Sequence, residues 1–459
     1  MIIKRDLQFY KRIMVIALPI IIQNIITNFV SLVDNVMIGS LGTLEMSGVS
    51  IVNAVLFVYN LTLYGANSGP GIYTSQFVGT KNKKGVQECF YFKLFIGIVV
   101  VSIGILMMKI LGKNLIGLYL SSSNSALENT TTLNYAYTYL SIMLVGLVPF
   151  MLSQVYMTTL RETENTLVPM IASMVAIFSN VVLNALLIFG IGIFPKLGIT
   201  GAAIATVISR YIEFFILFFY AHFVDKVGYF KNLYTSIHIN LPLYKNIIIK
   251  GFPLLCNEFL WGFSLKAIVQ CYSTRGIEAV AAINITSTVV DMFQIMTYSV
   301  GMSISILLAQ RLGNNDQHTE IYKDAWYMIY FGIFMCAITG ITLSIVAPFF
   351  VELYNTTDTV KSIALMCLRI SSIDIIILSL DYSSYYILRA GGKTFITFLF
   401  DSIYTFFISF GIAFILSRCT SVSVVIIYLA VALMNIPKGL LGMWLVKKKI
   451  WMNNIVEEY

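Results

Sequence analysis

Long apolar stretches recur along the chain, and short segments that contain charged residues, glycine or proline separate them. Twelve such stretches are present, centred near residues 25, 62, 100, 145, 178, 210, 260, 296, 335, 375, 405 and 435. Each is long enough for a helix to cross about 30 Å of hydrocarbon. They lack the alternation of polar and apolar residues that is typical of membrane β-strands. The pattern therefore predicts an all-α integral membrane protein of about twelve transmembrane helices.

The composition agrees with this interpretation and excludes several classes of protein. Of the 459 residues, 58% are hydrophobic and 11% are charged, whereas soluble domains carry about 25% charged residues. The six cysteines lie in or beside the apolar stretches without paired spacing, so we expect no disulfide framework and no zinc site. The three histidines fall between the stretches, and no phosphate-binding loop is present. These observations argue against an intramembrane enzyme and against a transporter that hydrolyses ATP.

Basic residues are distributed unequally between the two sides of the predicted membrane. The termini and the loops on their side carry nineteen of them: Lys4, Arg5, Lys11, Arg12, Lys81, Lys83, Lys84, Arg161, Lys226, Lys231, Lys245, Lys250, Arg311, Lys323, Arg389, Lys393, Lys447, Lys448 and Lys449. The opposite loops carry six: Lys109, Lys113, Lys196, Arg275, Lys361 and Arg418. The positive-inside rule then predicts a multi-pass protein of the plasma membrane with both termini in the cytoplasm. Because the net charge of +8 is spread over many loops, we expect no nucleic-acid partner.

The two halves of the chain repeat each other. A shift of 234 positions aligns residues 10–79 with residues 244–313 without a gap and gives twelve identities. The identities include a proline within a predicted helix, Pro19 with Pro253, and glycines at predicted turns. A shared apolar composition alone does not produce matches of these residue types, because proline and glycine have specific effects on the backbone. The chain is therefore predicted to be an internal duplication.

The duplication predicts an N-terminal lobe at residues 1–223, a cytoplasmic linker at 224–243 and a C-terminal lobe at 244–459. With six spans in each lobe, equivalent helices run in the same direction, so an axis along the membrane normal relates the lobes. Such parallel repeats enclose a central cleft, and rocking of the lobes around it provides alternating access. This layout suits a transporter better than a pore.

Several stretches, taken in their order along the chain, resemble the multidrug and toxic compound extrusion (MATE) family. They are SLVDNVMIGSLGTLEMSGVSI, SQFVGTKNKKG, NVVLNALLIFG, GITGAAIATVISR, AQRLGNNDQ and LRAGGKT. The resemblance covers essentially the whole chain. It implies a twelve-helix, two-lobe antiporter that exports drugs, often cationic ones, in exchange for sodium ions or protons. The chain departs from the family pattern in LRETENT, where Glu164 stands in place of the usual glycine.

Polar residues in the spans of the first half are candidate site residues, because such residues are costly to insert into a membrane. Asp34 matches the aspartate of the family's D-x-x-M-x-G stretch, which implies a role in cation coupling. Asn180 and Asn184 lie four residues apart on one helix face and resemble the family's pair, although asparagines also join helices. We expect these three residues to form the cation-coupling site of the N-terminal lobe. Pro19 predicts a bend in the first helix, either a moving hinge or a static kink.

The spans of the second half hold more carboxylates, namely Glu258, Asp291, Asp374, Asp381 and Asp401. They are candidates for cation coupling or substrate binding. A cluster of carboxylate oxygens suits a sodium ion, and carboxylates that share a site also retain protons, so the sequence leaves the coupling ion open between Na⁺ and H⁺. Lys266, eight residues after Glu258, offers an ion pair as an alternative. Arg369 and Lys438 also lie within spans, and the sequence assigns them no role.

The predicted function is export of drugs or other small, often cationic, organic compounds by a cation-coupled antiporter. We expect a monomer in the lipid bilayer that uses no cofactor apart from the coupling ion, Na⁺ or H⁺. The alternative is a flippase for a lipid-linked saccharide, from the same broad superfamily. A flippase cavity should be cationic in order to hold a pyrophosphate, whereas the charges in the spans of the second half are mainly acidic.

Overall fold

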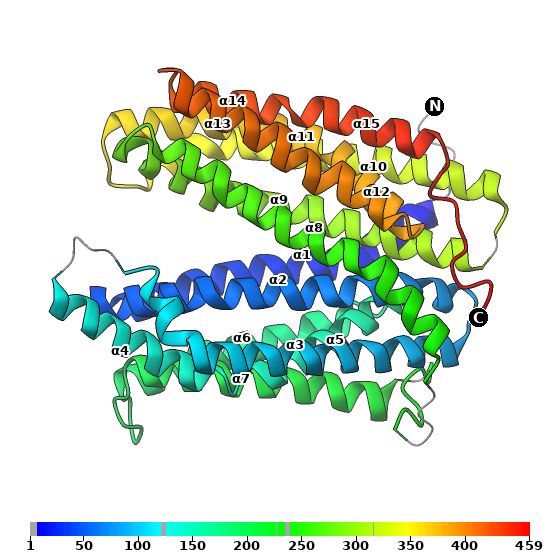
Figure 1. Ribbon diagram of the computed structural model, residues 1–459, viewed down its shortest axis with the longest axis horizontal. Coiled ribbons are helices and arrows are strands. Elements are labelled where there is room, and N and C mark those ends of the chain that lie inside the picture. The colour runs from blue at the N-terminus through cyan, green and yellow to red at the C-terminus, as the bar shows by residue number, and fades with distance from the viewer. Residues whose placement is uncertain (1–6, 121–124, 226, 235–238, 315) are drawn as a thin grey trace. The chain divides into compact units, whose positions relative to one another are not determined.

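The computed structural model describes residues 7–120, 125–225, 227–234, 239–314 and 316–459. All regular secondary structure in these residues is helical (Figure 1). The α-helices are α1 (Leu7–Gly39), α2 (Thr43–Gly79), α3 (Lys83–Gly117), α4 (Ala126–Met143), α5 (Leu147–Glu162), α6 (Leu167–Phe189), α7 (Ile199–Phe219), α8 (Leu241–Ser273), α9 (Ile277–Gly313), α10 (His318–Glu352), α11 (Asp358–Ala390), α12 (Thr394–Phe398), α13 (Gly411–Cys419), α14 (Val424–Leu433) and α15 (Asn435–Lys447). Three π-helical segments continue them, namely η1 (Tyr220–Val224), η2 (Leu399–Ile403) and η3 (Thr405–Phe410). The predicted all-α fold is confirmed.

The number of membrane spans also agrees with the prediction. Eleven described helices are long and apolar enough to cross a membrane, and the pair α4 and α5, bent by 51° at a short break, makes twelve when counted as one span. Several helices are much longer than a bilayer requires. With 37 residues each, α2 and α9 are about 55 Å long, compared with about 30 Å of hydrocarbon. Their ends therefore extend beyond the membrane core.

The internal duplication is visible in the bounds of the helices. The pair α1 and α8 has 33 residues each, and the pair α2 and α9 has 37; in both pairs the second helix begins 234 residues after the first. The pair α3 and α10 has 35 residues each, at a shift of 235. Gly42 and Gly276, which the same shift aligns, precede α2 and α9 with φ angles of 153° and 96°. Positive φ favours glycine, so the same residue type ends the turn in both halves.

The later spans of the two halves differ. The fourth span of the first half is broken between α4 and α5, whereas its counterpart α11 is one continuous helix. The fifth span of the first half is the regular helix α6, whereas its counterpart is interrupted by η2 and η3. π-Helical turns are rare and occur frequently at functional sites. The second half therefore has an unusual backbone where its fifth span begins.

The chain folds as two compact units. The N unit comprises Ile22–Thr74 and Lys83–Tyr244, and the C unit comprises Met1–Ile21, Ser75–Asn82 and Lys245–Tyr459. The predicted lobes at 1–223 and 244–459, with a linker at 224–243, assign residues 1–21 and 75–82 differently, and that division stays a prediction. Along α1 the chain passes from the C unit to the N unit two residues after Pro19. Lys4, Arg5, Lys226 and residues 235–238 of the predicted linker lie outside the described residues.

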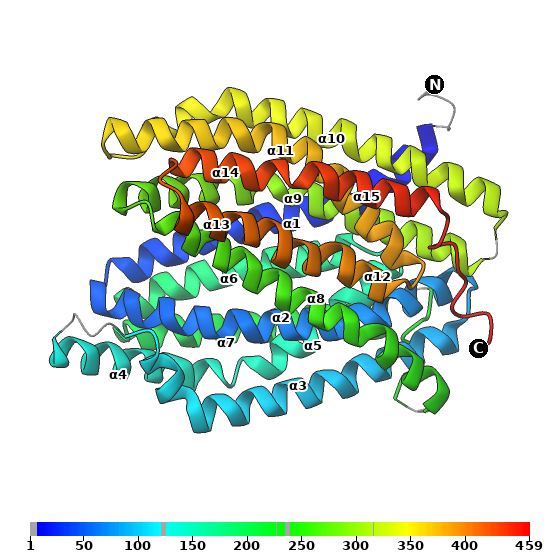
Figure 2. The ribbon, with the colours of Figure 1, turned by 45° about the horizontal axis from the view of Figure 1, so that its top comes forward.

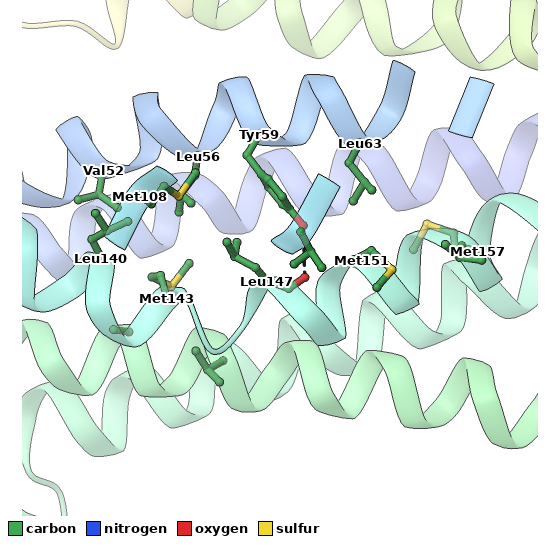
Figure 3. Close-up of a cluster of buried hydrophobic side chains, with 14 of the residues drawn as sticks. Val52, Leu56, Tyr59, Leu63, Met108, Leu140, Met143, Leu147, Met151 and Met157 are labelled. Atoms are coloured by element: carbon green, nitrogen blue, oxygen red, sulfur yellow. Dashed lines mark hydrogen bonds between the residues drawn. The ribbon is translucent and has the colours of Figure 1, made fainter. Parts of the chain in front are cut away.

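The core of the N unit surrounds the break between α4 and α5 (Figure 3). Side chains from α2, such as Val52 and Leu56, pack there with methionines from α3, α4 and α5. The Tyr59 hydroxyl donates a hydrogen bond to the carbonyl oxygen of Leu147 at 3.4 Å, just after the break. Arg210 of α7 donates to the carbonyl oxygen of Gly146 at 3.2 Å. Two side chains thus donate hydrogen bonds to backbone carbonyl groups at the break in this span.

In the C unit, α11 is the central helix. It packs against the two helices that precede it, α9 and α10, and against two later helices, α14 and α15 (Figures 1 and 2). Two glycines allow α15 to come close: a Cβ atom at Gly439 would lie 3.1 Å from Cβ of Leu380, and one at Gly442 would lie 2.6 Å from Cβ of Ser384. Small residues at helix interfaces permit such close approach. This packing brings α15 against the stretch of α11 that contains Asp381.

Candidate functional site

The predicted polar residues of the first half meet in the N unit. The side-chain amide of Asn184 donates to Oδ1 of Asp34 at 2.8 Å and to Oδ1 of Asn180 at 3.2 Å. Asn180 in turn donates to the Thr206 hydroxyl at 3.4 Å. Both asparagines are buried, and Asp34 is half-buried. The spacing of four residues on α6 directs both amides to one place, and α1 and α7 supply the other two side chains.

The donors around Asp34 are neutral. If the Asn180 amide is turned by 180°, its NH₂ group reaches both oxygens of Asp34, at 3.1 and 3.0 Å, and its oxygen accepts from the backbone N–H of Thr206 at 3.3 Å. Within the described part of the chain, no ion pair joins Asp34 to a basic side chain. Oδ1 of Asn184 is buried and has no hydrogen-bond partner there. The site thus offers a carboxylate and a spare oxygen acceptor, both of which suit a proton or a small cation.

The C unit contains a different arrangement, an ion-paired cluster around Lys438 of α15. Its ammonium lies 2.8 Å from Oδ2 of Asp381 on α11 and 2.7 Å from Oδ1 of Asp401 in η2. The three residues are 4%, 4% and 8% exposed, so the charges are shielded from water. Charges buried in this way need a partner, because the free energy of desolvation is large. Asp381 and Asp401, both predicted as candidates, therefore meet at Lys438, a basic residue for which no role was predicted.

Neutral side chains complete the cluster. Asn257 of α8 donates to Oδ2 of Asp401 at 2.9 Å and accepts from the Ser402 hydroxyl at 2.8 Å. The next residue, Glu258, is buried as well, and its Oε1 accepts from the Tyr385 hydroxyl at 3.4 Å. Lys438 is thus the basic partner of Asp381 and Asp401, whereas Lys266 is exposed on α8.

The remaining two carboxylates take no part in this cluster. Asp374 lies two turns before Asp381 on α11, and its Oδ1 accepts from the side-chain amide of Asn435 at 2.8 Å. Asp291 is exposed on α9. In the described residues, no group of three or more His, Cys, Asp or Glu side chains has an arrangement that could hold a metal ion. A sodium site at the carboxylates of the second half stays a prediction.

Sequence reasoning missed four residues that complete these clusters: Thr206, Asn257, Asn435 and Lys438. All four lie in predicted spans, where a polar side chain is costly. That cost is a signal that each has a partner. It does not identify the partner, since Lys438 and Asp381 lie 57 positions apart on different helices. Only the packing of α15 on α11 joins them.

The close packing at Gly442 leads to a testable prediction. In Gly442→Ala, the new methyl group would lie 2.6 Å from Cβ of Ser384 and 2.8 Å from Cζ of Phe400. Because α15 must then move away from α11, we expect the free energy of unfolding to fall by about 1–3 kcal/mol. Gly411→Ala is the control, since nothing lies within 4 Å of a Cβ atom there, and it should change stability by less than about 1 kcal/mol. Thermal unfolding of the purified proteins compares them, and equal stability would contradict the packing argument.

Comparison with known proteins adds the family relationship. The MatE family model matches residues 19–186 and 254–418, one segment in each half of the chain. A protein of Thermotoga maritima described as a probable multidrug resistance protein NorM is 23% identical over 388 residues, which cover 84% of this chain and 80% of that protein. A protein of Bacillus subtilis described as a probable multidrug resistance protein YoeA is 28% identical over 305 residues, covering 65% and 63%.

The fold has close counterparts among solved structures. The crystal structure of the D35N mutant of the Vibrio cholerae MATE transporter VcmN has a TM-score of 0.85 to this chain at 19% identity, and covers 97% of this chain and 98% of its own. A similarity of this extent at such low identity shows that the two chains share a fold. The two matched segments of the family model coincide with the two copies of the repeat.

Proposed function

This chain belongs to the MatE family of membrane transporters, and from that premise we propose that it exports small, often cationic, organic compounds by cation-coupled antiport. The observation that carries the proposal is Asp34, a half-buried carboxylate within a membrane span to which neutral amides donate hydrogen bonds. Among the described residues, no basic side chain forms an ion pair with it. A proton or a sodium ion can therefore bind to it and leave it during each transport cycle.

The amide network provides a way for the binding of a cation to change the N unit. With Asp34 charged, the asparagine NH₂ groups donate to its oxygens. With Asp34 protonated, the carboxyl becomes a donor, and the unpartnered Oδ1 of Asn184 is an acceptor nearby. The two states thus favour different hydrogen bonds between α1 and α6. Pro19 removes one backbone hydrogen bond from α1, which lowers the cost of bending that helix when the network changes.

The substrates and the setting are proposed from the relatives. Two of them are described as multidrug resistance proteins, so we assign drugs as the class of substrate. The chain acts as a monomer in the plasma membrane, with both termini in the cytoplasm as the distribution of basic residues predicts. No cofactor is required beyond the coupling ion, Na⁺ or H⁺. No part of this function is enzymatic, since the family consists of transporters.

A reconstituted transport assay tests the proposal. The purified chain in proteoliposomes should move a fluorescent cationic dye against its gradient when a sodium or a proton gradient is imposed, one at a time. The gradient that drives transport identifies the coupling ion. If neither gradient drives transport of any cationic compound tested, antiport is wrong. Movement of a lipid-linked saccharide between leaflets by the same liposomes would support the flippase alternative.

A further inference from the structure

The Lys438 ammonium occupies a point that three side-chain oxygens surround. It lies 2.8 Å from Oδ2 of Asp381, 2.7 Å from Oδ1 of Asp401 and 3.3 Å from Oγ1 of Thr405. An ammonium has three N–H donors, so these three acceptors satisfy all of them. Oxygens converging on a buried point are also what a sodium ion requires in a membrane transporter. Lysine and sodium would therefore compete for one place.

The corresponding place in the N unit supports this interpretation. There Gln23 of α1 donates to the Ser173 hydroxyl of α6 at 2.6 Å, and Ser173 donates to Oε1 of Glu213 of α7 at 2.5 Å. The internal repeat relates these positions to the C-unit cluster. A shift of 234 positions relates Gln23 to Asn257, and a shift of 228, which also aligns Leu160 and Arg161 with Leu388 and Arg389, relates Ser173 to Asp401. Glu213 and Lys438 each lie fourteen residues after the first residue of their span.

Both units therefore join their first, fifth and sixth spans with a polar contact made by their own side chains. In the N unit the middle residue is a neutral hydroxyl, and a carboxylate completes the contact. In the C unit the middle residue is Asp401, and a second carboxylate, Asp381, adjoins it. Two carboxylates at one buried point need a cation, either a bound proton or a counter-ion. Lysine supplies the counter-ion where the N unit has glutamate.

We propose that Lys438 is a resident cation, which takes the place of a free sodium ion between Asp381 and Asp401, so that this cluster binds no free monovalent cation. Among the described residues, the other charged groups near the cluster include Glu258, Asp374 and Arg389. The inference rests on the proposed function in one respect: it assigns the coupling cation of the antiporter to Asp34 of the N unit. Lys438→Met keeps the apolar stem of the side chain and removes the charge, and it should open the place to sodium.

The test measures thermal unfolding of the full-length chain in detergent, in sodium chloride and in choline chloride of equal ionic strength. The wild-type protein should unfold at the same temperature in both salts. Lys438→Met, and Lys438→Gln as a second variant, should unfold at a lower temperature in choline and regain about 3 °C or more in sodium. Adding Asp381→Asn to Lys438→Met should remove the response to sodium.

Lys93→Met is the matched control. Lys93 is a fully buried lysine of the N unit that pairs with a single carboxylate, Glu162, at 2.5 Å. Its loss should lower the unfolding temperature equally in both salts. If Lys438 only stabilised the fold, its variants would also unfold at equally lowered temperatures in both salts, and that result would overturn the proposal. Failure of both Lys438 variants to fold in sodium chloride would overturn it as well.

Measurements on the wild-type protein can also overturn the proposal. If sodium stabilises the wild-type chain and Asp381→Asn abolishes this stabilisation, a free ion binds in this cluster. That result would leave the antiport function intact, since a sodium-coupled transporter can bind its ion in either unit. Conversely, absence of gradient-driven transport would exclude antiport without affecting the response of Lys438→Met to sodium.

Discussion

Asp34→Asn should reduce gradient-driven transport of a cationic dye at least about tenfold while the protein still folds. The amide has nearly the shape of the carboxyl group, so the contact with Asn184 can be kept. It cannot carry the negative charge to which a proton or sodium ion binds. A loss of one charge–cation interaction worth more than about 1.4 kcal/mol corresponds to this factor. Initial rates of dye uptake into proteoliposomes, at equal protein content, measure the effect.

The control for this variant is the same substitution at an exposed carboxylate. Asp358→Asn changes the first residue of α11, outside the N unit, and should leave the rate within about twofold of wild type. Asp34→Glu keeps the charge and should retain part of the activity. Coupled transport by Asp34→Asn at the wild-type rate would place the coupling site elsewhere, and the carboxylates of the C unit would be examined next.

The second large effect concerns stability. Lys93→Met should lower the free energy of unfolding by about 3–5 kcal/mol, because it removes a fully buried cation that pairs with the Glu162 carboxylate. The ammonium of Lys93 lies 2.5 Å from Oε2 of Glu162 and 3.1 Å from Oγ1 of Thr159, and the lysine is 0% exposed. Glu162 is the last residue of α5, so the pair also joins α5 to α3. Thermal or denaturant unfolding in detergent gives the change.

A double variant separates loss of the charge partner from loss of packing. Lys93→Met with Glu162→Gln removes both charges and should recover most of the lost stability, since a buried pair can be replaced by neutral groups at little cost. Lys109→Met changes an exposed lysine of the same helix and should have almost no effect. A single variant as stable as wild type would mean that this pair contributes nothing to the folded state.

The sequence predicted the spans because the membrane imposes a simple rule. Every backbone N–H and C=O group within the hydrocarbon needs a partner, so a long apolar stretch becomes a helix whatever surrounds it. The repeat could be predicted for a related reason. Turn glycines such as Gly42 and Gly276 end the same helices in both halves, and their conformation depends on the local backbone rather than on distant contacts. The break in the fourth span of the first half and the π-helical interruption of the fifth span of the second half depend on tertiary packing and were not predicted.

The candidate site in the N unit was predicted in part. Asn180 and Asn184 share a helix face by their spacing alone, and the resemblance to the MATE family added Asp34. Thr206 lies on α7 and could not be connected to them, because the rotation of one helix against another depends on side-chain packing. The role of the three predicted residues in coupling stays a prediction until transport is measured.

The sequence by itself therefore determined that this protein is a duplicated, all-helical membrane protein with carboxylates in its spans, because hydrophobicity, helical spacing and repeated turns are local properties. Tertiary structure alone decided which charges meet. Gly439 and Gly442 let α15 approach α11, and this contact brings Lys438 to Asp381 and Asp401. A buried cation is stabilised by the oxygens within a few ångströms of it, and no pattern along one helix specifies those oxygens when they belong to two others.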